Sequence, residues 1–229
     1  FLSDRRVVEA KGAGWWLIFN GLILTRRPIS LGAAYERIWN NEAGEAPLKT
    51  ITRRQAEGLA KKFAGNSRIE VDWAMRYGAP TIGDAIARLN HKCCERIILF
   101  PLYPQYSAAT TATALDAAFE ALQTMRWQPT VRSVAPYFEH PAYIAALAAS
   151  LRAHLDTLGW APDKFITSFH SLPEAFIAKG DPYFCHCQKT YRLLRENLGL
   201  NEEFMLLTFQ SSTGRGKWLG PSTERCSRA

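Results

Sequence analysis

The chain has 229 residues, with 28 Lys and Arg against 21 Asp and Glu, so its formal net charge is +7 at pH 7. Hydrophobic residues make up 47% and charged residues 21%, a balance that excludes a disordered or fibrous protein. The longest apolar run, residues 15–24, is interrupted by Asn20 and is too short for a membrane-spanning helix. Five Cys residues in a chain of this length exclude a disulfide framework, and their odd number is typical of a reducing compartment. We therefore expect a soluble cytoplasmic protein.

The positive charge is spread along the chain in pairs of basic residues and forms no longer cluster. Proteins that bind nucleic acids usually concentrate basic residues on one stripe, or carry a motif that enters a groove. We therefore expect no nucleic-acid partner. A mildly basic, solvated surface explains the charge best, and a basic rim around an anionic small molecule is the alternative.

Strand-like and helix-like segments alternate along the sequence. The short apolar runs have the length and pattern of β-strands, and residues 96–100 have the composition of a strand buried on both faces. The expected strands are residues 69–75, 96–100, 130–135, 164–169 and 204–209. The expected helices between them are residues 81–89, 111–125, 141–158 and 182–198.

This alternation predicts an α/β fold of βαβ units, in which parallel sheets are flanked by helices. We expect two Rossmann-like lobes, residues 1–130 and residues 131–229. In open parallel sheets, ligands bind outside the carboxyl ends of the strands. Polar, aromatic, Gly and Pro residues follow four of the strands, so we expect these segments to share one rim that forms the site. The segments are residues 76–80, 101–107, 170–174 and 210–221.

Several familiar kinds of site are not supported by the motifs. No Gly-x-Ser-x-Gly elbow surrounds a serine, and neither Gly12-Ala-Gly14 nor Gly214-Arg-Gly216 completes a dinucleotide or phosphate-loop fingerprint. Cys185, His186 and Cys187 are adjacent, whereas zinc ligands are usually separated by two to four residues. At the start of a helix these three side chains point in different directions, so free thiols in a helix are the expected interpretation.

His170 is the candidate reactive residue. It lies at the carboxyl end of a predicted buried strand and is followed by a turn that contains a proline. An imidazole in this position can accept a proton near neutral pH or bind a metal such as iron. A histidine satisfied within the core is the alternative. The aromatic residues of the rim segments suit a large, flat, apolar ligand; they are Tyr77, Tyr103, Tyr106 and Trp218.

Short motifs occur in a fixed order over essentially the whole chain. They are FLSDRRV from residue 1, YERIW from residue 35, RYG from residue 76, YPQYS from residue 103, SFHSLPE from residue 168, KGDPY from residue 179, TFQS from residue 208 and WLGP from residue 218. Together they resemble the ferrochelatase family, whose members insert ferrous iron into a porphyrin to make haem. The context of Cys185, His186 and Cys187 is similar to that of bacterial members that act on protoporphyrin IX.

The resemblance implies roles for matched positions. His170 would be the active-site histidine, which accepts protons from the pyrrole nitrogens, binds iron on its path, or does both. Arg76 and Tyr77 would lie on the pocket opposite the histidine, with Tyr103 and Trp218 along the macrocycle.

The resemblance also implies a pocket lip near the amino terminus. Arg27 would lie in this lip near a propionate, while Ser30 stands where the family usually has a basic residue. The apolar residues 15–24 would form the lip helix that collects the porphyrin, and this helix could touch a membrane surface. No organic cofactor is implied. No iron–sulfur cluster is predicted, because Cys226 stands alone near the carboxyl terminus.

The sequence departs from the family pattern at both ends. The family's first strand and its carboxyl-terminal acidic helix have no counterpart here, and residues 223–229 do not resemble that continuation. Because the acidic helix supplies a glutamate that faces the histidine, the 229 residues alone are expected to insert iron poorly.

Three functions are compatible with these motifs. Protoporphyrin ferrochelatase is the first. The second is a chelatase of the same fold that uses coproporphyrin or another metal, because the motifs do not reveal the substrate's side chains. The third is a catalytically impaired fragment that binds porphyrin or haem.

Overall fold

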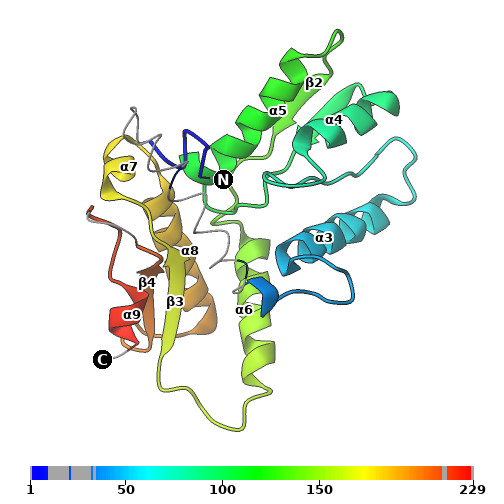
Figure 1. Cartoon of the computed structure of the whole chain (residues 1–229). Coiled ribbons are helices and arrows are strands. Elements are labelled where there is room, and N and C mark those ends of the chain that lie inside the picture. The colour runs from blue at the N-terminus through cyan, green and yellow to red at the C-terminus, as the bar shows by residue number, and fades with distance from the viewer. Residues whose placement is uncertain (1, 10–20, 22–31, 33–34, 213–215, 228–229) are drawn as a thin grey trace. The chain divides into compact units, whose positions relative to one another are not determined.

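The computed structural model describes residues 2–9, 21, 32, 35–212 and 216–227 (Figure 1). The chain divides into two compact units: residues Phe1–Leu99 with Thr113–Ser133, and residues Phe100–Ala112 with Val134–Ala229. Each unit contains a parallel pair of strands accompanied by helices, which confirms the predicted α/β class. The predicted lobes, residues 1–130 and 131–229, differ from these units in where residues 100–112 and 131–133 belong, and they stay a prediction.

The first unit is built around a two-stranded parallel sheet. Ile97 of β1 lies opposite Val131 of β2, and α4 and α5 cover this face. Side chains from α4, β1 and α5 form the buried core: Ile86, Ile97, Ala118 and Leu122. The elements are α3 (Pro47–Phe63), α4 (Ile82–His91), β1 (Arg96–Leu99), α5 (Thr113–Gln123) and β2 (Thr130–Ser133).

The helix predicted over residues 81–89 is confirmed as α4, and its first turn shows why it begins there. The Thr81 side chain accepts a hydrogen bond from the Asp84 backbone N–H, and the Asp84 carboxylate accepts one from the Thr81 N–H. This reciprocal capping satisfies backbone donors that the first turn of a helix leaves without partners.

The expectation that residues 96–100 form a strand buried on both faces is wrong. Ile97 is only 5% exposed, whereas its neighbour Ile98 is 70% exposed. Successive side chains of a strand point to opposite faces, and the helices packed on this sheet cover the Ile97 face. Among the described residues, β1 is therefore buried on one face only.

The expected strand over residues 69–75 is also wrong. In the described part of the chain these residues form no ladder, and Met75 makes only an isolated bridge with Thr81. A period-two sequence pattern specifies alternating faces, but a strand also needs a neighbouring backbone with which to pair.

The acidic residues of segment 69–75 instead form ion pairs with the last turn of α4 and with the residue directly after it. Arg88 donates two hydrogen bonds to Asp72, of 2.8 and 2.9 Å, and Lys92 pairs with Glu70. Four residues advance a helix by about 6 Å, and two residues advance an extended chain by about 6.6 Å. The two spacings match, so Asp72 and Glu70, two residues apart, pair with Arg88 and Lys92, four residues apart.

The second unit contains the other predicted strands. β3 and β4 are parallel, with Phe165 opposite Met205 and His170 opposite Gln210, so the strands expected at residues 164–169 and 204–209 are confirmed. The elements are a π-helical turn η2 (Ala108–Ala112), α6 (Pro141–Leu155), β3 (Phe165–His170), α7 (Glu174–Ala178), α8 (Tyr183–Leu198), β4 (Met205–Gln210) and α9 (Thr223–Cys226).

The core of the second unit lies between β4, α8 and the segments that follow the strands. Phe209 is at its centre, with the ring of Phe184 at a centroid distance of 5.7 Å and the ring of Phe169 at 6.2 Å. The buried members of this cluster are Leu172, Cys187, Phe209 and Leu219. The carboxyl end of β3 therefore rests on an apolar support.

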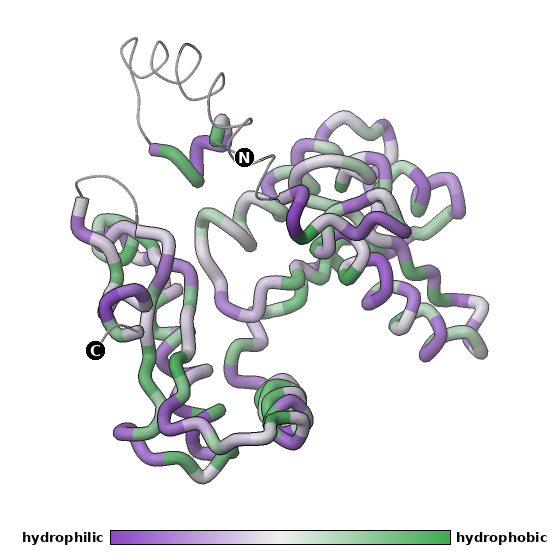
Figure 2. Tube along the Cα trace, turned by 60° about the horizontal axis from the view of Figure 1, so that its bottom comes forward, coloured by the Kyte–Doolittle hydropathy of each residue, from purple (hydrophilic) through white to green (hydrophobic). Residues whose placement is uncertain are grey.

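The remaining sequence expectations agree with the observed helices except at their ends. Residues 111–125 correspond to the end of η2 and to α5, residues 141–158 to α6, and residues 182–198 to α8. Hydrophilic and hydrophobic residues are interleaved along the trace within each unit (Figure 2). Among the described helices, none has the length and apolar content needed to cross a membrane.

Candidate functional site

His170 is the last residue of β3, whereas the sequence predicted that the strand ends at residue 169 and the turn begins at His170. The side chain is exposed, yet the protein atoms packed around it desolvate the ring and lower the pKa of His170 below its usual 6.5. The imidazole is therefore neutral at neutral pH, with a lone pair available for a proton or a metal ion.

The turn after His170 is fixed by hydrogen bonds to the segment that follows β4. The Ser171 backbone N–H donates to the Gln210 carbonyl at 2.7 Å, and the Ser171 hydroxyl donates to the Leu219 carbonyl at 2.9 Å. The Leu219 N–H in turn donates to the Leu172 carbonyl at 2.9 Å. Ser171 and Leu172 are both buried, so these bonds hold the turn rigidly beside His170.

Trp218 lies on the segment joined to this turn. It forms an isolated antiparallel bridge with Pro173, and the Glu174 N–H donates to the Lys217 carbonyl at 3.0 Å. The indole is half-buried. The structure thus brings together two of the predicted rim segments, those that carry His170 and Trp218.

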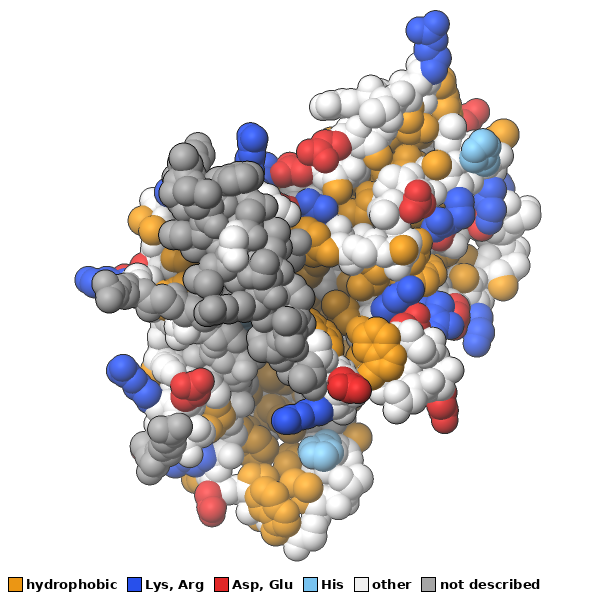
Figure 3. Space-filling view, in the orientation of Figure 1, with side chains coloured by type: hydrophobic (Ala, Val, Ile, Leu, Met, Phe, Trp, Pro, Cys, Tyr) orange, Lys and Arg blue, Asp and Glu red, His pale blue; other side chains and the backbone are white. Residues whose placement is uncertain are grey.

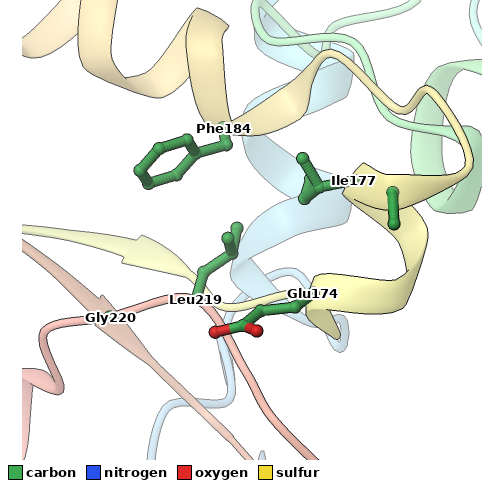
Figure 4. Close-up of a pocket in the computed structure, with 6 residues that line it drawn as sticks. Glu174, Ile177, Phe184, Leu219 and Gly220 are labelled. Carbon is green, nitrogen blue, oxygen red and sulfur yellow. The ribbon is translucent and has the colours of Figure 1, made fainter.

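A pocket of about 400 Å³ lies between α7, the start of α8 and the Leu219 segment (Figure 4). Its wall is mostly apolar, and the carboxylate of Glu174 extends beside Leu219. The direction of Glu174 could not be read from the sequence because Pro173 precedes it. The lining residues are Glu174, Ile177, Ala178, Phe184, Leu219 and Gly220.

Cys187 of α8 is kept as a thiol. Burial raises the pKa of Cys187 to about 12, which outweighs the opposing effect of its hydrogen bond with Tyr183. Burial also raises the pKa of Tyr183, whose hydroxyl is further hydrogen-bonded to the His170 backbone. Cys185 is exposed while Cys187 is buried, so the two side chains point in different directions, as expected. Among the described residues, no group of three or more His, Cys, Asp or Glu is placed to hold a metal ion.

Tyr103 lies in the segment that follows β1, belongs to the second unit and is half-buried. A few residues after Tyr103, the same segment is hydrogen-bonded to Asp181, which lies just before α8. The Asp181 carboxylate accepts hydrogen bonds from the Ser107 hydroxyl at 3.1 Å and from the Ala108 N–H at 2.7 Å. Sequence reasoning did not single out Asp181 as a site residue, although it stands inside the KGDPY motif.

Arg76 and Tyr77 meet at the carboxylate of Asp4 in the first unit. Arg76 Nη2 donates to Asp4 at 2.6 Å, the Tyr77 hydroxyl donates at 2.9 Å, and the guanidinium lies 4.5 Å from the centre of the Tyr77 ring. Burial alone would raise the pKa of Asp4, but hydrogen bonds from the Arg6 backbone, Tyr77 and Arg76 outweigh it and lower that pKa. Burial, and next the bond to Asp4, raise the pKa of Tyr77 to about 12.

The chain is similar to known proteins over its whole length. A family model described as ferrochelatase matches residues 1–229. This chain belongs to the ferrochelatase family. The ferrochelatase of Agrobacterium fabrum is 52% identical over 225 residues, covering 98% of this chain and 65% of the relative. That of Rhizobium meliloti is 53% identical over 224 residues, covering 98% and 66%, and that of Rhodopseudomonas palustris is 51% identical over 225 residues, covering 98% and 65%.

The chain therefore spans slightly less than two thirds of the length of these ferrochelatases. Within it, the structure pairs Arg76 with Tyr77 in the first unit and places Tyr103, His170 and Trp218 in the second. Arg27 lies outside the described residues. The roles of these residues toward a porphyrin, and their meeting on one rim, stay predictions.

Proposed function

We propose that this protein inserts ferrous iron into protoporphyrin IX, the final step of haem synthesis. The observation that carries the proposal is the ferrochelatase family match over residues 1–229, with about 52% identity to curated members. The exposed imidazole at the carboxyl end of β3 supports it, because ligands of parallel sheets bind at that edge.

The reaction exchanges two protons for one metal ion at the same four nitrogens. Fe²⁺ enters as the substrate, and the two pyrrole N–H protons leave, so charge is conserved. We assign His170 as the group that accepts a pyrrole proton or guides the ion, since its lowered pKa keeps the imidazole neutral. The hydrogen-bonded turn at Ser171 and the apolar support around Phe209 would hold the ring at one angle to the substrate.

The other site residues would bind the macrocycle. We assign Tyr103 and Trp218 to its flat surface, because half-buried aromatic rings offer apolar contact to a planar ligand. We also assign Arg76 and Tyr77 of the first unit to porphyrin binding, and Asp4 fixes both side chains within that unit. A rigid wall of this kind can bind a bent ring better than a flat one, which exposes the nitrogen lone pairs.

The assay that tests the proposal is anaerobic incubation with ferrous iron and protoporphyrin IX, followed by haem absorbance. It is run on the protein extended to the length of its relatives and, beside it, on the 229 residues alone, which we expect to insert iron poorly. Coproporphyrin, cobalt and nickel are run in parallel, because turnover with one of these alone would change the assigned substrate. Saturable quenching of porphyrin fluorescence by the extended protein, without turnover on any of these substrates, would overturn the enzymatic function and leave a porphyrin-binding protein.

The partners follow from the same proposal. Basic side chains lie in separate places on the face drawn in Figure 3, several of them beside acidic ones, which favours a small anionic ligand over a nucleic acid. We place the reaction in the cytoplasm and assign residues 15–24 to a lip that touches a membrane surface. Apart from Gly21, this stretch lies outside the described residues, and its apolar sequence is the support. Flotation with lipid vesicles tests the contact.

We expect Arg27→Ala to weaken porphyrin binding by about tenfold at most, because a charge-assisted bond at an exposed lip is worth roughly 1 kcal/mol or somewhat more. The measurement is fluorescence quenching at low and high salt, and the loss should shrink at high salt. Arg54→Ala, an equal charge change on an exposed position of α3, is the control. Equal affinity of the wild type for the porphyrin and for its dimethyl ester would contradict a role for the propionates.

A further inference from the structure

Four consecutive residues, 105–108, are each hydrogen-bonded to the first half of α8 or to the turn before it. Two of these bonds use the backbone N–H groups of the segment, and two use its side chains. The bonds are Gln105 Nε2 to Thr190 Oγ1 at 2.9 Å, Tyr106 N to His186 Nδ1 at 3.1 Å, Ser107 Oγ to Asp181 Oδ2 at 3.1 Å and Ala108 N to Asp181 Oδ2 at 2.7 Å. We call these residues the clamped segment.

Two of the clamping side chains are buried and firmly placed. Asp181 is 9% exposed, and its second oxygen accepts the Tyr183 N–H in the first turn of α8 at 3.0 Å. Gly180, with φ of +97°, allows the chain to turn there from α7 into Asp181, a conformation that other residues rarely adopt. The Thr190 hydroxyl donates to the Phe138 carbonyl at 2.7 Å while accepting from Gln105.

His186 is the member of the clamp whose hydrogen-bonding capacity changes when it binds a proton. Its ring stacks on Phe138, with centroids 3.7 Å apart and planes inclined by 10°, so the imidazole is held in one plane. Nδ1 accepts the Tyr106 N–H, which requires a lone pair on that nitrogen and places the single proton on Nε2. A second proton on Nδ1 would set two N–H donors against each other.

The charges around His186 come from two directions. Asp181 and Glu139 raise the pKa of His186, but burial has the larger effect and lowers it overall below 6.5. Glu139 is itself paired with Lys189 at 3.4 Å, which moderates its field. A histidine whose pKa is lower in the folded state stabilises that state at pH values above its unfolded pKa. The stabilisation is lost as the pH falls below about 6.5 toward the folded-state pKa.

We propose that neutral His186 is a positioning residue for the clamped segment and, through it, for Tyr103 on the porphyrin, and that protonation of His186 releases the segment. The inference rests on the proposed porphyrin-binding function, because Tyr103 acts only if a macrocycle is bound. It adds to His170 a second histidine that acts at a distance through backbone geometry.

The direct test is hydrogen exchange of the Tyr106 amide between pH 7.5 and 5.5, corrected for intrinsic exchange. In the wild type we expect protection to fall about five- to tenfold over this range, the worth of one net hydrogen bond. His186→Gln offers an amide oxygen as acceptor and should keep protection while losing the pH dependence. His186→Leu should lose protection at every pH. Constant protection in the wild type would overturn the inference.

The matched control is His140→Gln. His140 Nδ1 also accepts a backbone N–H, that of Ala142 at 3.2 Å, but at the start of α6. This substitution should leave the Tyr106 amide unchanged at both pH values. If His186→Leu does not fold, the comparison of the wild type with His186→Gln still decides, because both carry an acceptor and only one titrates.

The second readout is the dissociation constant of protoporphyrin IX against pH, followed by fluorescence quenching. The wild type should lose affinity below about pH 6.5 more steeply than His186→Gln. Any titration of the porphyrin itself affects both proteins equally, so the difference between them reports on His186. If exchange of the Tyr106 amide depends on pH but the wild type and His186→Gln bind porphyrin with identical curves, the role of His186 toward porphyrin is overturned. Absence of porphyrin binding in every variant, with exchange as expected, would overturn the proposed function and leave His186 as the residue that orders the segment.

Discussion

In the protein extended to the length of its ferrochelatase relatives, replacing His170 with Ala is expected to reduce iron insertion by about 10²- to 10⁴-fold, the usual contribution of a positioned proton acceptor. Porphyrin binding should stay nearly unchanged, because the fixed turn around Ser171 and the aromatic residues Tyr103 and Trp218 do not depend on the imidazole. The measurements are initial rates under anaerobic conditions and fluorescence quenching by the same preparation. Added imidazole should restore part of the rate in His170→Ala, since a small base can enter the space left at an exposed strand end.

His154→Ala is the control for this experiment. His154 is exposed in the last turn of α6, in the second unit like His170, and it does not belong to the proposed site. We expect its turnover to match that of the wild type. A His170→Ala variant of the extended protein that kept most of its turnover would overturn the assignment. An extended protein with the wild-type sequence and no turnover on any porphyrin or metal would overturn the proposed reaction itself.

The strands of the second unit could be predicted from the sequence because local pattern and tertiary environment agree there. Residues 204–209 are a short apolar run, and residues 164–169 combine aromatic and β-branched residues. The two segments pair as parallel strands, and β4 packs against α8. The position of His170 at the end of this strand could be predicted for the same reason, while its role toward iron and porphyrin stays a prediction.

Other elements escaped prediction because sequence pattern does not specify partners. Residues 69–75 alternate like a strand, yet their acidic positions bind Arg88 of α4 and Lys92, the residue after that helix. α3 was not predicted, although Pro47 in its first turn and Lys61 in its last turn are typical signals of the ends of a helix.

The clamped segment was unpredictable for a further reason. The hydrogen-bond partners of Tyr106 and Ser107 lie 80 and 74 residues further along the chain. The sequence showed His186 beside two cysteines, which suggested only metal binding or thiols in a helix. Its stacking on Phe138 and its bond to the Tyr106 backbone exist only in the folded unit.

Phe209→Ala is expected to have the largest effect on stability in the second unit. The side chain is 0% exposed and packs between the rings of Phe169 and Phe184, directly under the end of β3. Removing a buried phenylalanine ring costs about 3–5 kcal/mol, because apolar surface is lost and a cavity remains. Domains of this size are stable by only about 5–15 kcal/mol, so the variant should unfold at much lower urea concentration. Far-UV circular dichroism and tryptophan fluorescence report the transition.

The same chemical change at Phe204 separates packing from loss of a phenyl ring as such. Phe204 precedes β4, and its side chain is 48% exposed, so Phe204→Ala should cost about 1 kcal/mol or less. Its backbone carbonyl accepts the Phe165 N–H at 2.7 Å, a bond that alanine preserves. Because Phe209 supports the strand that ends at His170, iron insertion by Phe209→Ala should fall even at temperatures where the chain is folded. Equal losses of stability at the two positions would show that the cluster around Phe209 is not the core of this unit.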